Sequence, residues 1–330
     1  MTRAFHSSGD LVADRRAEYA RMLDEGGDAA AAAELIAQAL EIVPGWAAGW
    51  DLLGTYAHKA GRIEEALAAW RRVLALDTGG IFGAELKLAA HGAALDAQQT
   101  AVPYVQALFD DYAPRFDTAL LQRLDYRVPE LLSDMLGVAM ALVGATGFAH
   151  TIDLGCGTGL MGERLRRLTA ELTGVDLSAG MLAECGRRGI YDRLEQAEIA
   201  AYLEASGTAD LITAADVFAY CGALPPMLAA VWRALAPGGV FAFSLERNDG
   251  DADCVLRSSL RYAHSAAATR AALVEQGFEV LAFDEQPIRT DGGAPVTGLL
   301  VVALRPKARA DDPVATSVHG ASAVAARLSD

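Results

Sequence analysis

The sequence predicts an α/β protein in which a doubly wound, largely parallel sheet follows an all-helical N-terminal region. Three observations predict it. β-rich runs alternate with helical ones from about residue 149, a glycine-rich turn follows the first of these runs, and a helical pattern repeats over residues 13–80. A chain of 330 residues is about twice the length of a typical domain, so two folding units are expected.

Composition limits the classes of partner. The net charge is −15, which repels phosphate backbones and anionic lipids, so nucleic acid and membranes are not expected as targets. The cysteines (Cys156, Cys185, Cys221 and Cys254) show no metal-ligand spacing, which predicts free thiols and no metal site. The first residues lack the apolar stretch of a signal peptide, and the longest apolar run, Leu136–Ala149, is too short for a bilayer. We therefore expect a cytoplasmic protein.

The N-terminal region, residues 10–98, contains a repeated pattern of small and bulky residues. It resembles the tetratricopeptide repeat in Trp50, Leu53, Gly54, Gly61, Ala66 and Trp70, although Ala57 stands where that pattern has a tyrosine. A similar pattern lies 34 residues earlier, which predicts two helix pairs at 13–46 and 47–80. The segment Ala84–Leu95 would cap their apolar face. A generic helical hairpin is the alternative.

Residues 99–146 predict helices broken at Pro114 and Pro129, as a linker or lid. The α/β domain follows at 147–306, with strands expected at 149–154, 171–175, 211–214, 240–245, 279–283 and 298–304, and helices at 159–169, 179–187, 224–236 and 266–276. Only the turn-like stretch 289–293 separates the last two strands, which predicts a closing antiparallel hairpin. The tail, 307–330, is expected to be disordered.

The glycine-rich turn carries the main functional signal. A buried strand ends at Leu154, and Gly155, Gly157 and Gly159 then lead into a helix. Glycine is required where the backbone takes positive φ and where no Cβ can stand between the chain and a ligand. The next strand ends at Asp176, whose carboxylate suits two neighbouring ribose hydroxyls.

This GxGxG spacing, with Leu160 in place of a third dinucleotide-type glycine and Asp153 two residues before the loop, resembles motif I of the class I S-adenosylmethionine-dependent methyltransferases. A nicotinamide-binding domain is the alternative. The resemblance implies a Rossmann-like sheet of seven strands that binds S-adenosylmethionine. It assigns cofactor binding to Asp153, Gly155, Gly157, Gly159, Asp176, Leu177, Glu198, Ile199 and Asp216. Glu198 and Ile199 would hold the adenine, and Asp216 would face the methyl group. The alternative to cofactor binding is a structural role, in which Glu198 begins a helix and Asp216 caps a turn.

Further segments resemble a bacterial group of tetratricopeptide-repeat methyltransferases, namely 109–117 with 126–129, 260–265, and 292–298. The resemblance implies a lid that places Tyr112 over the cofactor and Arg115 or Arg127 near its carboxylate. Packing and surface ion pairs are the alternatives for these three residues.

The candidate catalytic residues are His264, Tyr262 and Tyr112, with Arg261 beside the first two. Histidine titrates near neutral pH, which makes His264 the candidate general base. Together these features predict a methyltransferase that acts on an oxygen or nitrogen atom of a small molecule. Two alternatives are a peptide methyltransferase whose repeats hold the substrate, and a non-catalytic interaction protein. The repeats could also bind a protein partner or form the contact of a homo-oligomer.

Overall fold

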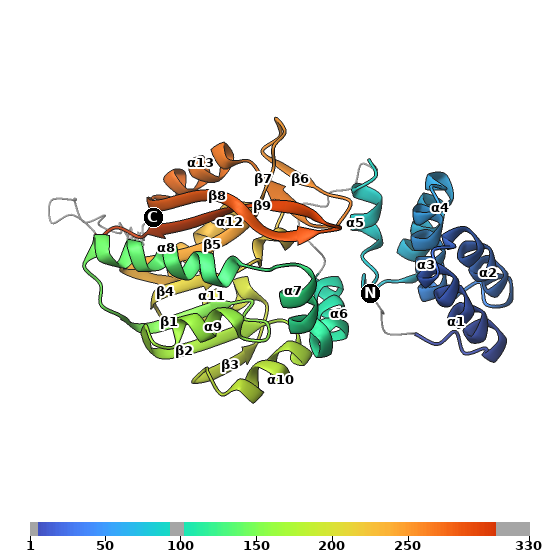
Figure 1. Ribbon diagram of the computed structural model, residues 1–330, viewed down its shortest axis with the longest axis horizontal. Helices are drawn as coiled ribbons and strands as arrows, with labels where there is room; N and C mark the ends of the chain where they lie inside the picture. The colour runs from blue at the N-terminus through green and yellow to red at the C-terminus, as the bar shows by residue number, and fades with distance from the viewer. Residues whose placement is uncertain (1–5, 93–101, 308–330) are drawn as a thin grey trace, which may run out of the picture.

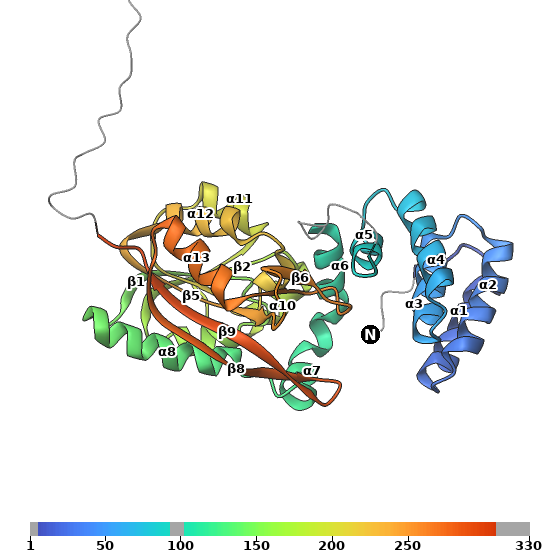
Figure 2. The same cartoon turned by 90° about the horizontal axis from the view of Figure 1, so that it is seen from above.

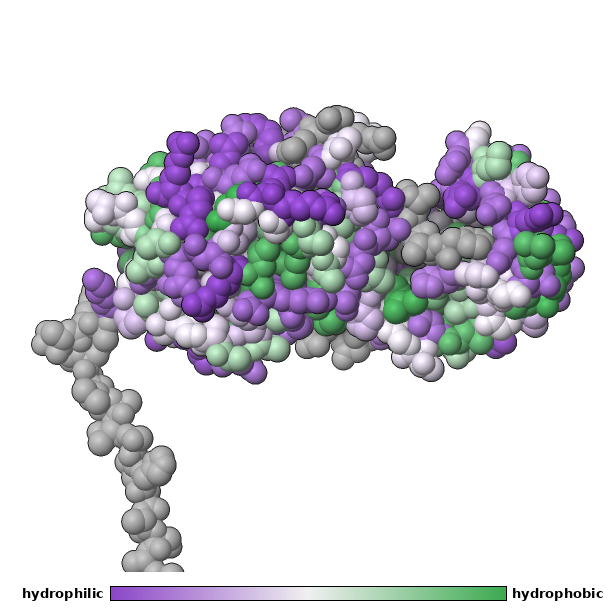
Figure 3. Space-filling model, turned by 90° about the horizontal axis from the view of Figure 1, so that it is seen from below, coloured by the Kyte–Doolittle hydropathy of each residue, from purple (hydrophilic) through white to green (hydrophobic). Residues whose placement is uncertain are grey.

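The computed structural model describes residues 6–92 and 102–307, to which every structural statement below refers. The molecule has two lobes, an N-terminal helical one and a larger α/β one, and polar residues cover much of the face in Figure 3. Within the described residues, no helix combines the length and the apolar character needed to cross a membrane.

The N-terminal lobe contains two helix pairs at the predicted positions. They are α1 (Leu11–Glu25) with α2 (Ala29–Ile42), and α3 (Ala47–Lys59) with α4 (Ile63–Leu76). The side chains of Asp10 and Asp28 cap the first two helices by accepting from backbone amides. A Cβ at Gly54 would overlap the Trp70 ring, so α3 and α4 pack closely because this residue is glycine. Helix α5 (Ala84–Ala89) follows, and the last residues of the predicted cap, 93–95, lie outside the described part of the chain.

Two prolines divide the next segment where the sequence predicts breaks. Helix α6 (Val102–Tyr112) ends in a 3-10 turn (Ala113–Arg115) that contains Pro114, and α7 (Phe116–Arg123) follows. Pro129 lies in the first turn of α8 (Val128–Val143), where the missing N–H has no helical partner to lose.

The sheet of the α/β lobe has strand order β3-β2-β1-β4-β5, continued by β9 and β8. The bounds are β1 (Phe148–Leu154), β2 (Thr169–Asp176), β3 (Arg193–Gln196), β4 (Ala209–Ala214), β5 (Leu235–Arg247), β8 (Glu279–Asp291) and β9 (Ala294–Leu304). The first five are parallel, and β9 pairs antiparallel with both β5 and β8. The predicted closing hairpin is present, but its turn is shorter than expected because Arg289 already pairs with Val296.

The prediction of seven strands is wrong for the described residues, since the sheet contains nine. A short hairpin of β6 (Cys254–Leu256) and β7 (Tyr262–His264) pairs with the end of β5 at Glu246 and Arg247. Each added strand has only three residues, too few for an alternating pattern of apolar and polar residues to be recognised.

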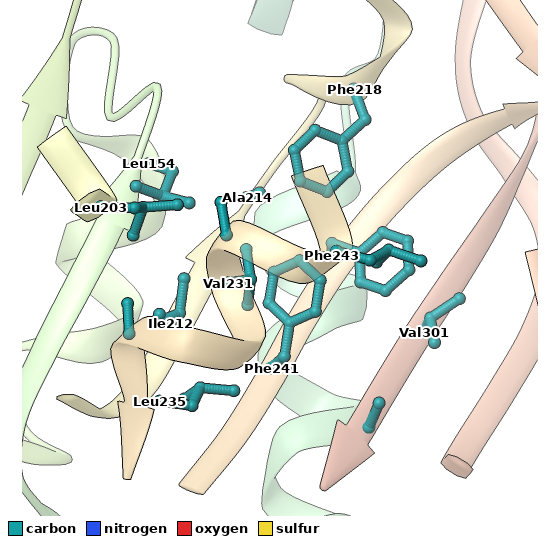
Figure 4. Close-up of a cluster of buried hydrophobic side chains, with 14 of the residues drawn as sticks. Leu154, Leu203, Ile212, Ala214, Phe218, Val231, Leu235, Phe241, Phe243 and Val301 are labelled. Atoms are coloured by element: carbon teal, nitrogen blue, oxygen red, sulfur yellow. The ribbon is translucent and has the colours of Figure 1, made fainter. Parts of the chain in front are cut away.

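Helices cover both faces of the sheet, as Figures 1 and 2 show. Helices α11 (Ile199–Ala205), α12 (Leu224–Ala234) and α13 (Ala266–Gln276) pack on one face, and α8 and α9 (Leu160–Leu165) on the other, while α10 (Ala179–Arg188) lies beside β2 and β3. Helix α9 is shorter than predicted because the chain turns at Leu168 into β2. The first face is packed around Phe218, Phe241 and Phe243, the last two of which stack with ring centroids 4.5 Å apart (Figure 4).

Candidate active site

A cavity of about 540 Å³ lies at the carboxyl ends of the central strands. In a parallel α/β sheet, this edge is where ligands bind. Its wall comes from the glycine turn after β1, the ends of β2 and β4, the start of α11, and the segment α6–α7, with contributions from the end of β8. The volume lies in the usual range of small-molecule sites.

The three glycines of the turn all take left-handed backbone angles, with φ of +60° at Gly155, +55° at Gly157 and +97° at Gly159. A Cβ at Gly155 would overlap Val217. One at Gly157 would enter the cavity 3.8 Å from the Phe116 ring. Gly155 and Gly157 border the cavity, whereas Gly159 begins α9 and is not part of its wall. At Gly155 and Gly157 the turn therefore presents a cradle of backbone atoms to the cavity, flanked by Cys156 and Thr158.

Asp176 fastens this cradle to the end of β2. Its Oδ2 accepts a hydrogen bond from the Gly157 amide, and its Oδ1 accepts one from the Ser178 amide, both at 2.8 Å. Burial raises the pKa of Asp176, although these hydrogen bonds act in the opposite direction. Each carboxylate oxygen has a second lone pair, so the group can still accept from a ligand hydroxyl. Leu177 borders the cavity beside it.

The residues expected at the adenine also border the cavity. Glu198 and Ile199 lie at the start of α11, and Glu198 Oε2 accepts from the Ala201 amide at 2.9 Å. Glu198 therefore caps a helix, as the alternative interpretation holds, and lines the cavity as well.

Asp153 lies below the cavity and is absent from its wall. Its oxygens accept from the Tyr191 hydroxyl and the Thr213 hydroxyl, each at 2.6 Å. The side chain is 1% exposed, and burial raises its pKa to about 6. The geometry therefore corrects its predicted cofactor contact: Asp153 ties β1 to β4 and to the chain before β3.

The segment α6–α7, which we call the lid, covers the cradle with aromatic side chains. Tyr112 borders the cavity as expected, with Phe109 and Phe116, and the Tyr112 and Phe116 rings meet edge to face at 5.5 Å. Two carboxylates fasten the lid to the domain. Asp110 accepts from Ser178 Oγ at 2.5 Å, and Asp117 accepts from Thr158 Oγ1 at 2.5 Å and pairs with Arg188.

The two arginines expected near the cofactor carboxylate lie away from the cavity wall. Arg115 pairs with Asp111 at 2.7 Å, and Arg127 lies 3.9 Å from Glu130 on the surface. Both therefore make surface ion pairs, which was the alternative interpretation.

His264 and Tyr262 also lie outside the cavity wall. His264 is 3% exposed, its Nε2 is 3.0 Å from the Cys221 carbonyl oxygen, and burial lowers its pKa. A carbonyl only accepts, so this nitrogen carries the proton and cannot serve as a base. Tyr262 packs with Leu86, Tyr104 and Leu260. The structure thus gives both predicted catalytic side chains packing positions on β7.

A buried ionic cluster lies at the other end of the cavity, and the sequence predicts only two of its members, Asp216 and Arg261, as site residues. Its members are Asp216 at the end of β4, Glu246 on β5, Arg261 before β7, and Arg289 on β8, with Arg257 at its edge. Of these, Asp216, Arg261 and Arg289 border the cavity, next to Tyr126 and Tyr220.

The cluster is held by short contacts. Arg261 Nη2 is 2.5 Å from Asp216 Oδ1, and its Nε pairs with Glu246, whose Oε1 accepts from Arg289 Nη2 at 2.5 Å. Burial would raise the pKa of Glu246, but the charges of Arg261 and Arg289 outweigh it and lower the pKa. Asp216 takes φ +61°, a left-handed angle that few side chains adopt. The sequence signal was a charged residue directly after the apolar run of β5, since a buried charge requires partners.

Residues 152–239 match the family described as "Methyltransferase domain". The chain is 39% identical over 105 residues to malonyl-[acyl-carrier protein] O-methyltransferase of Enterobacter lignolyticus, covering 32% of this chain and 42% of that protein. It is 36% identical over 111 residues to trans-aconitate 2-methyltransferase of Deinococcus radiodurans, covering 33% and 42%. It is 31% identical over 176 residues to human methyltransferase-like protein 27, covering 51% and 65%. The matched part thus spans less than half the length of the first two relatives.

Among solved structures, magnesium protoporphyrin IX methyltransferase from Synechocystis with bound S-adenosylhomocysteine superposes with a TM-score of 0.47 at 17% identity, over 62% of this chain and 99% of that one. An S-adenosylmethionine-dependent methyltransferase from Clostridium acetobutylicum gives 0.45 at 20% identity, over 60% and 99%.

Proposed function

We propose that this chain, whose α/β lobe is an S-adenosylmethionine-dependent methyltransferase domain, methylates an oxygen or nitrogen atom of a small molecule held in the cavity. The observation that carries the proposal is the cradle at the ends of β1 and β2. There a Cβ at Gly157 would project into the cavity, and Asp176 presents two carboxylate oxygens beside it.

The residues of the wall fit the cofactor. The backbone at Gly155 and Gly157 leaves room for its amino-acid part, Asp176 can accept from its ribose hydroxyls, and Glu198 and Ile199 border the space for its base. When bound, S-adenosylmethionine supplies a methyl group on a positively charged sulfur, which a nucleophile displaces in line. Holding two reactants in such alignment lowers a barrier by roughly 7–11 kcal/mol.

The chain's own residues provide the enclosure. Phe109, Tyr112 and Phe116 of the lid exclude water from the cradle. Burial raises the pKa values of Tyr126 and Tyr220, so both keep their protons and can donate hydrogen bonds to an acceptor.

A small-molecule acceptor is supported by the size of the cavity and by the relatives. The lid is fastened through Asp110 and Asp117, which leaves little room for a macromolecular segment over the cradle. One relative is named for trans-aconitate and another for a malonyl group on a carrier protein. The intact cradle argues against the reading as a non-catalytic interaction protein.

The N-terminal helices are, in this proposal, a pair of tetratricopeptide repeats. The close approach of Gly54 to Trp70 supports this, because the repeat requires a small residue there. Ile81 and Phe82, which follow the second pair, border the cavity. The peptide-methyltransferase alternative would instead use the outer surface of the helices, where a protein partner or second subunit can also bind.

The test compares two glycines with similar backbone angles. Gly157→Ala places a methyl group in the cradle. Gly189→Ala is the control: its φ of +62° imposes a similar backbone strain, but it lies away from the cavity and nothing is within 4 Å of the added Cβ. S-adenosylhomocysteine at about 100 times its dissociation constant should stabilise the wild type and Gly189→Ala by about 2.7 kcal/mol. Thermal unfolding with and without this ligand measures the effect.

We expect Gly157→Ala to lose most of this stabilisation. Equal stabilisation of both variants would contradict the cradle assignment. No stabilisation of the wild type, or stabilisation by NAD instead, would contradict the function itself.

A further inference from the structure

One side of the cavity presents a buried cation whose hydrogen-bonding capacity is not used up. Arg289 is 7% exposed and borders the cavity, and its Nη2 donates to Glu246. Its Nη1 has no hydrogen-bond partner among the described residues, and it lies 3.6 Å from Oδ1 of Asp216, too far for a hydrogen bond. A buried donor left without a partner is costly, especially on a charged group, so the position favours a ligand that accepts from it.

The charges around Arg289 favour an anion. Three guanidinium groups (Arg257, Arg261 and Arg289) meet two carboxylates (Asp216 and Glu246), which leaves one positive charge in excess. Asp291 also borders the cavity, but it is exposed to water and lies within 4 Å of no described arginine or lysine nitrogen. An anionic group beside Arg289 would balance the excess.

The part of the wall that contains Arg289 lies apart from the cradle. Gly157 and Asp176 follow β1 and β2, while Asp216, Arg261 and Arg289 gather beyond the ends of β4 and β5, on the side of the sheet order where β9 and β8 continue. The cation therefore belongs to the half of the cavity that the cofactor cradle leaves to the acceptor.

We propose that the methyl acceptor is a small carboxylic acid, and that Arg289, supported by Arg261, binds its carboxylate. This rests on the function proposed above and deepens it. Arginine suits the task because its planar fork matches the two oxygens of a carboxylate.

A carboxylate also suits the chemistry that this wall can provide. Its oxygen carries no proton, so its methylation, in which an O–C bond forms as the C–S bond breaks, requires no base. Tyr126 and Tyr220, which line the cavity, keep their protons, Asp216 is paired with Arg261, and His264 lies outside the wall. The ester group that forms carries no charge, so Arg289 would hold it less tightly than the carboxylate.

The experiment measures binding of acids to the full chain saturated with S-adenosylhomocysteine. Acetate, malonate and trans-aconitate are titrated against sodium chloride of equal ionic strength, with dimethyl malonate as the uncharged counterpart, and thermal unfolding of the α/β lobe is followed. We expect at least one acid to stabilise the wild type, and dimethyl malonate not to. Arg289→Gln should weaken the binding of that acid at least tenfold, which corresponds to about 1.4 kcal/mol. Arg289→Lys should retain part of the affinity, and the surface control Arg233→Gln should bind like the wild type.

Two results would overturn the proposal while leaving the methyltransferase function intact. In the first, S-adenosylhomocysteine stabilises the wild type but none of the three acids exceeds chloride. In the second, Arg289→Gln responds to S-adenosylhomocysteine and still binds the acid like the wild type. If Arg289→Gln does not fold, Arg289→Lys decides, because binding of the acid by that variant as tightly as by the wild type contradicts a site built on the guanidinium group of Arg289. If S-adenosylhomocysteine does not stabilise the wild type at all, the proposed methyltransferase function itself is refuted.

Discussion

Asp153 shows how burial and hydrogen bonding compete over one carboxyl group. Its two oxygens accept from Tyr191 and Thr213, which favours the charged form, but removal from water disfavours it more and raises its pKa to about 6. The folded protein therefore holds this proton more tightly than the unfolded chain, whose ordinary pKa is 3.8. The stability that this group contributes is complete below that value and is lost as the pH rises through about 6.

Asp153→Asn should remove this pH dependence. Between about pH 4 and pH 7 the wild type should lose about 2 kcal/mol of unfolding free energy relative to the variant, since one pKa unit is about 1.4 kcal/mol and the loss has already begun at about pH 4. The two hydroxyls can reorient to serve an amide. Urea unfolding across this range measures the difference, with the exposed Asp134→Asn as control. Parallel pH profiles for the wild type and Asp153→Asn would refute the raised pKa.

Single residues also mark what the sequence could and could not predict. The positive φ angles at Gly155 and Gly157 followed from the need for a turn without side chains, and Asp176 from its place at a strand end. The chemistry of His264 predicts a role in the site, and the resemblance to motif I predicts one for Asp153. Their true positions depend on which way a strand residue points and on what packs over it, and neither is contained in local sequence.

At the scale of elements, the lid is fastened to the domain through polar contacts near the junction of its two helices. Asp117 on α7 accepts from Thr158 in the glycine turn and pairs with Arg188 on α10. Asp110 on α6 accepts from Ser178 and the Gly180 amide at the start of α10. Because the contacts reach the residues that form the cradle, opening of the lid and exposure of the cradle are one event.

Asp117→Ala should loosen the lid. A partly exposed hydrogen bond and ion pair together contribute about 1 kcal/mol, so S-adenosylhomocysteine should bind about fivefold more weakly. Amide hydrogen exchange should become faster across α6 and α7. Calorimetric titration and exchange mass spectrometry measure the two effects, with Asp134→Ala on α8 as control. Unchanged exchange in α6 and α7 would show that Asp117 does not hold the lid.

The predictability of an element depended on its length and burial. Strands β1, β4 and β5 were recognised because both faces are covered, which produces continuous apolar runs. Strand β3 is largely exposed, and β6 and β7 have three residues each, so none carries a clear pattern. The hairpin β6–β7 places Arg261 in the ionic cluster. Because the sequence does not predict this hairpin, it does not predict the part of the cavity wall that the cluster forms.

At the scale of the whole molecule, each lobe has a core of its own. The N-terminal core is built from α1–α5, and the α/β core lies on both faces of the sheet. Lys87 on α5 pairs with Asp51 on α3, and their side chains are 7% and 2% exposed. Since removing one partner of a buried pair leaves the other charge uncompensated, we expect this pair to contribute mainly to the stability of the N-terminal lobe, although Leu86 of α5 also packs against Leu260 and Tyr262 of the α/β lobe.

Asp51→Ala should destabilise the N-terminal lobe by about 3–5 kcal/mol and leave the other lobe unchanged. Calorimetry should resolve two unfolding transitions. The variant should lower only one of them, and S-adenosylhomocysteine should raise only the other. Glu34→Ala, which removes an exposed partner of Arg62, serves as control. A single transition that responds to both changes would show that the lobes unfold together.

The cavity draws its walls from distant parts of the chain, from Phe82 and the lid through Gly157 to Arg289. During synthesis the cradle emerges well before the hairpin β8–β9, so the cofactor half of the site can form while the acceptor half is still lacking a wall. Contacts between residues far apart in sequence form late because closing long loops costs entropy. If the proposed function holds, a newly made chain would thus be able to bind the cofactor before the acceptor, and selectivity for the acceptor would be the last property to appear as the protein matures.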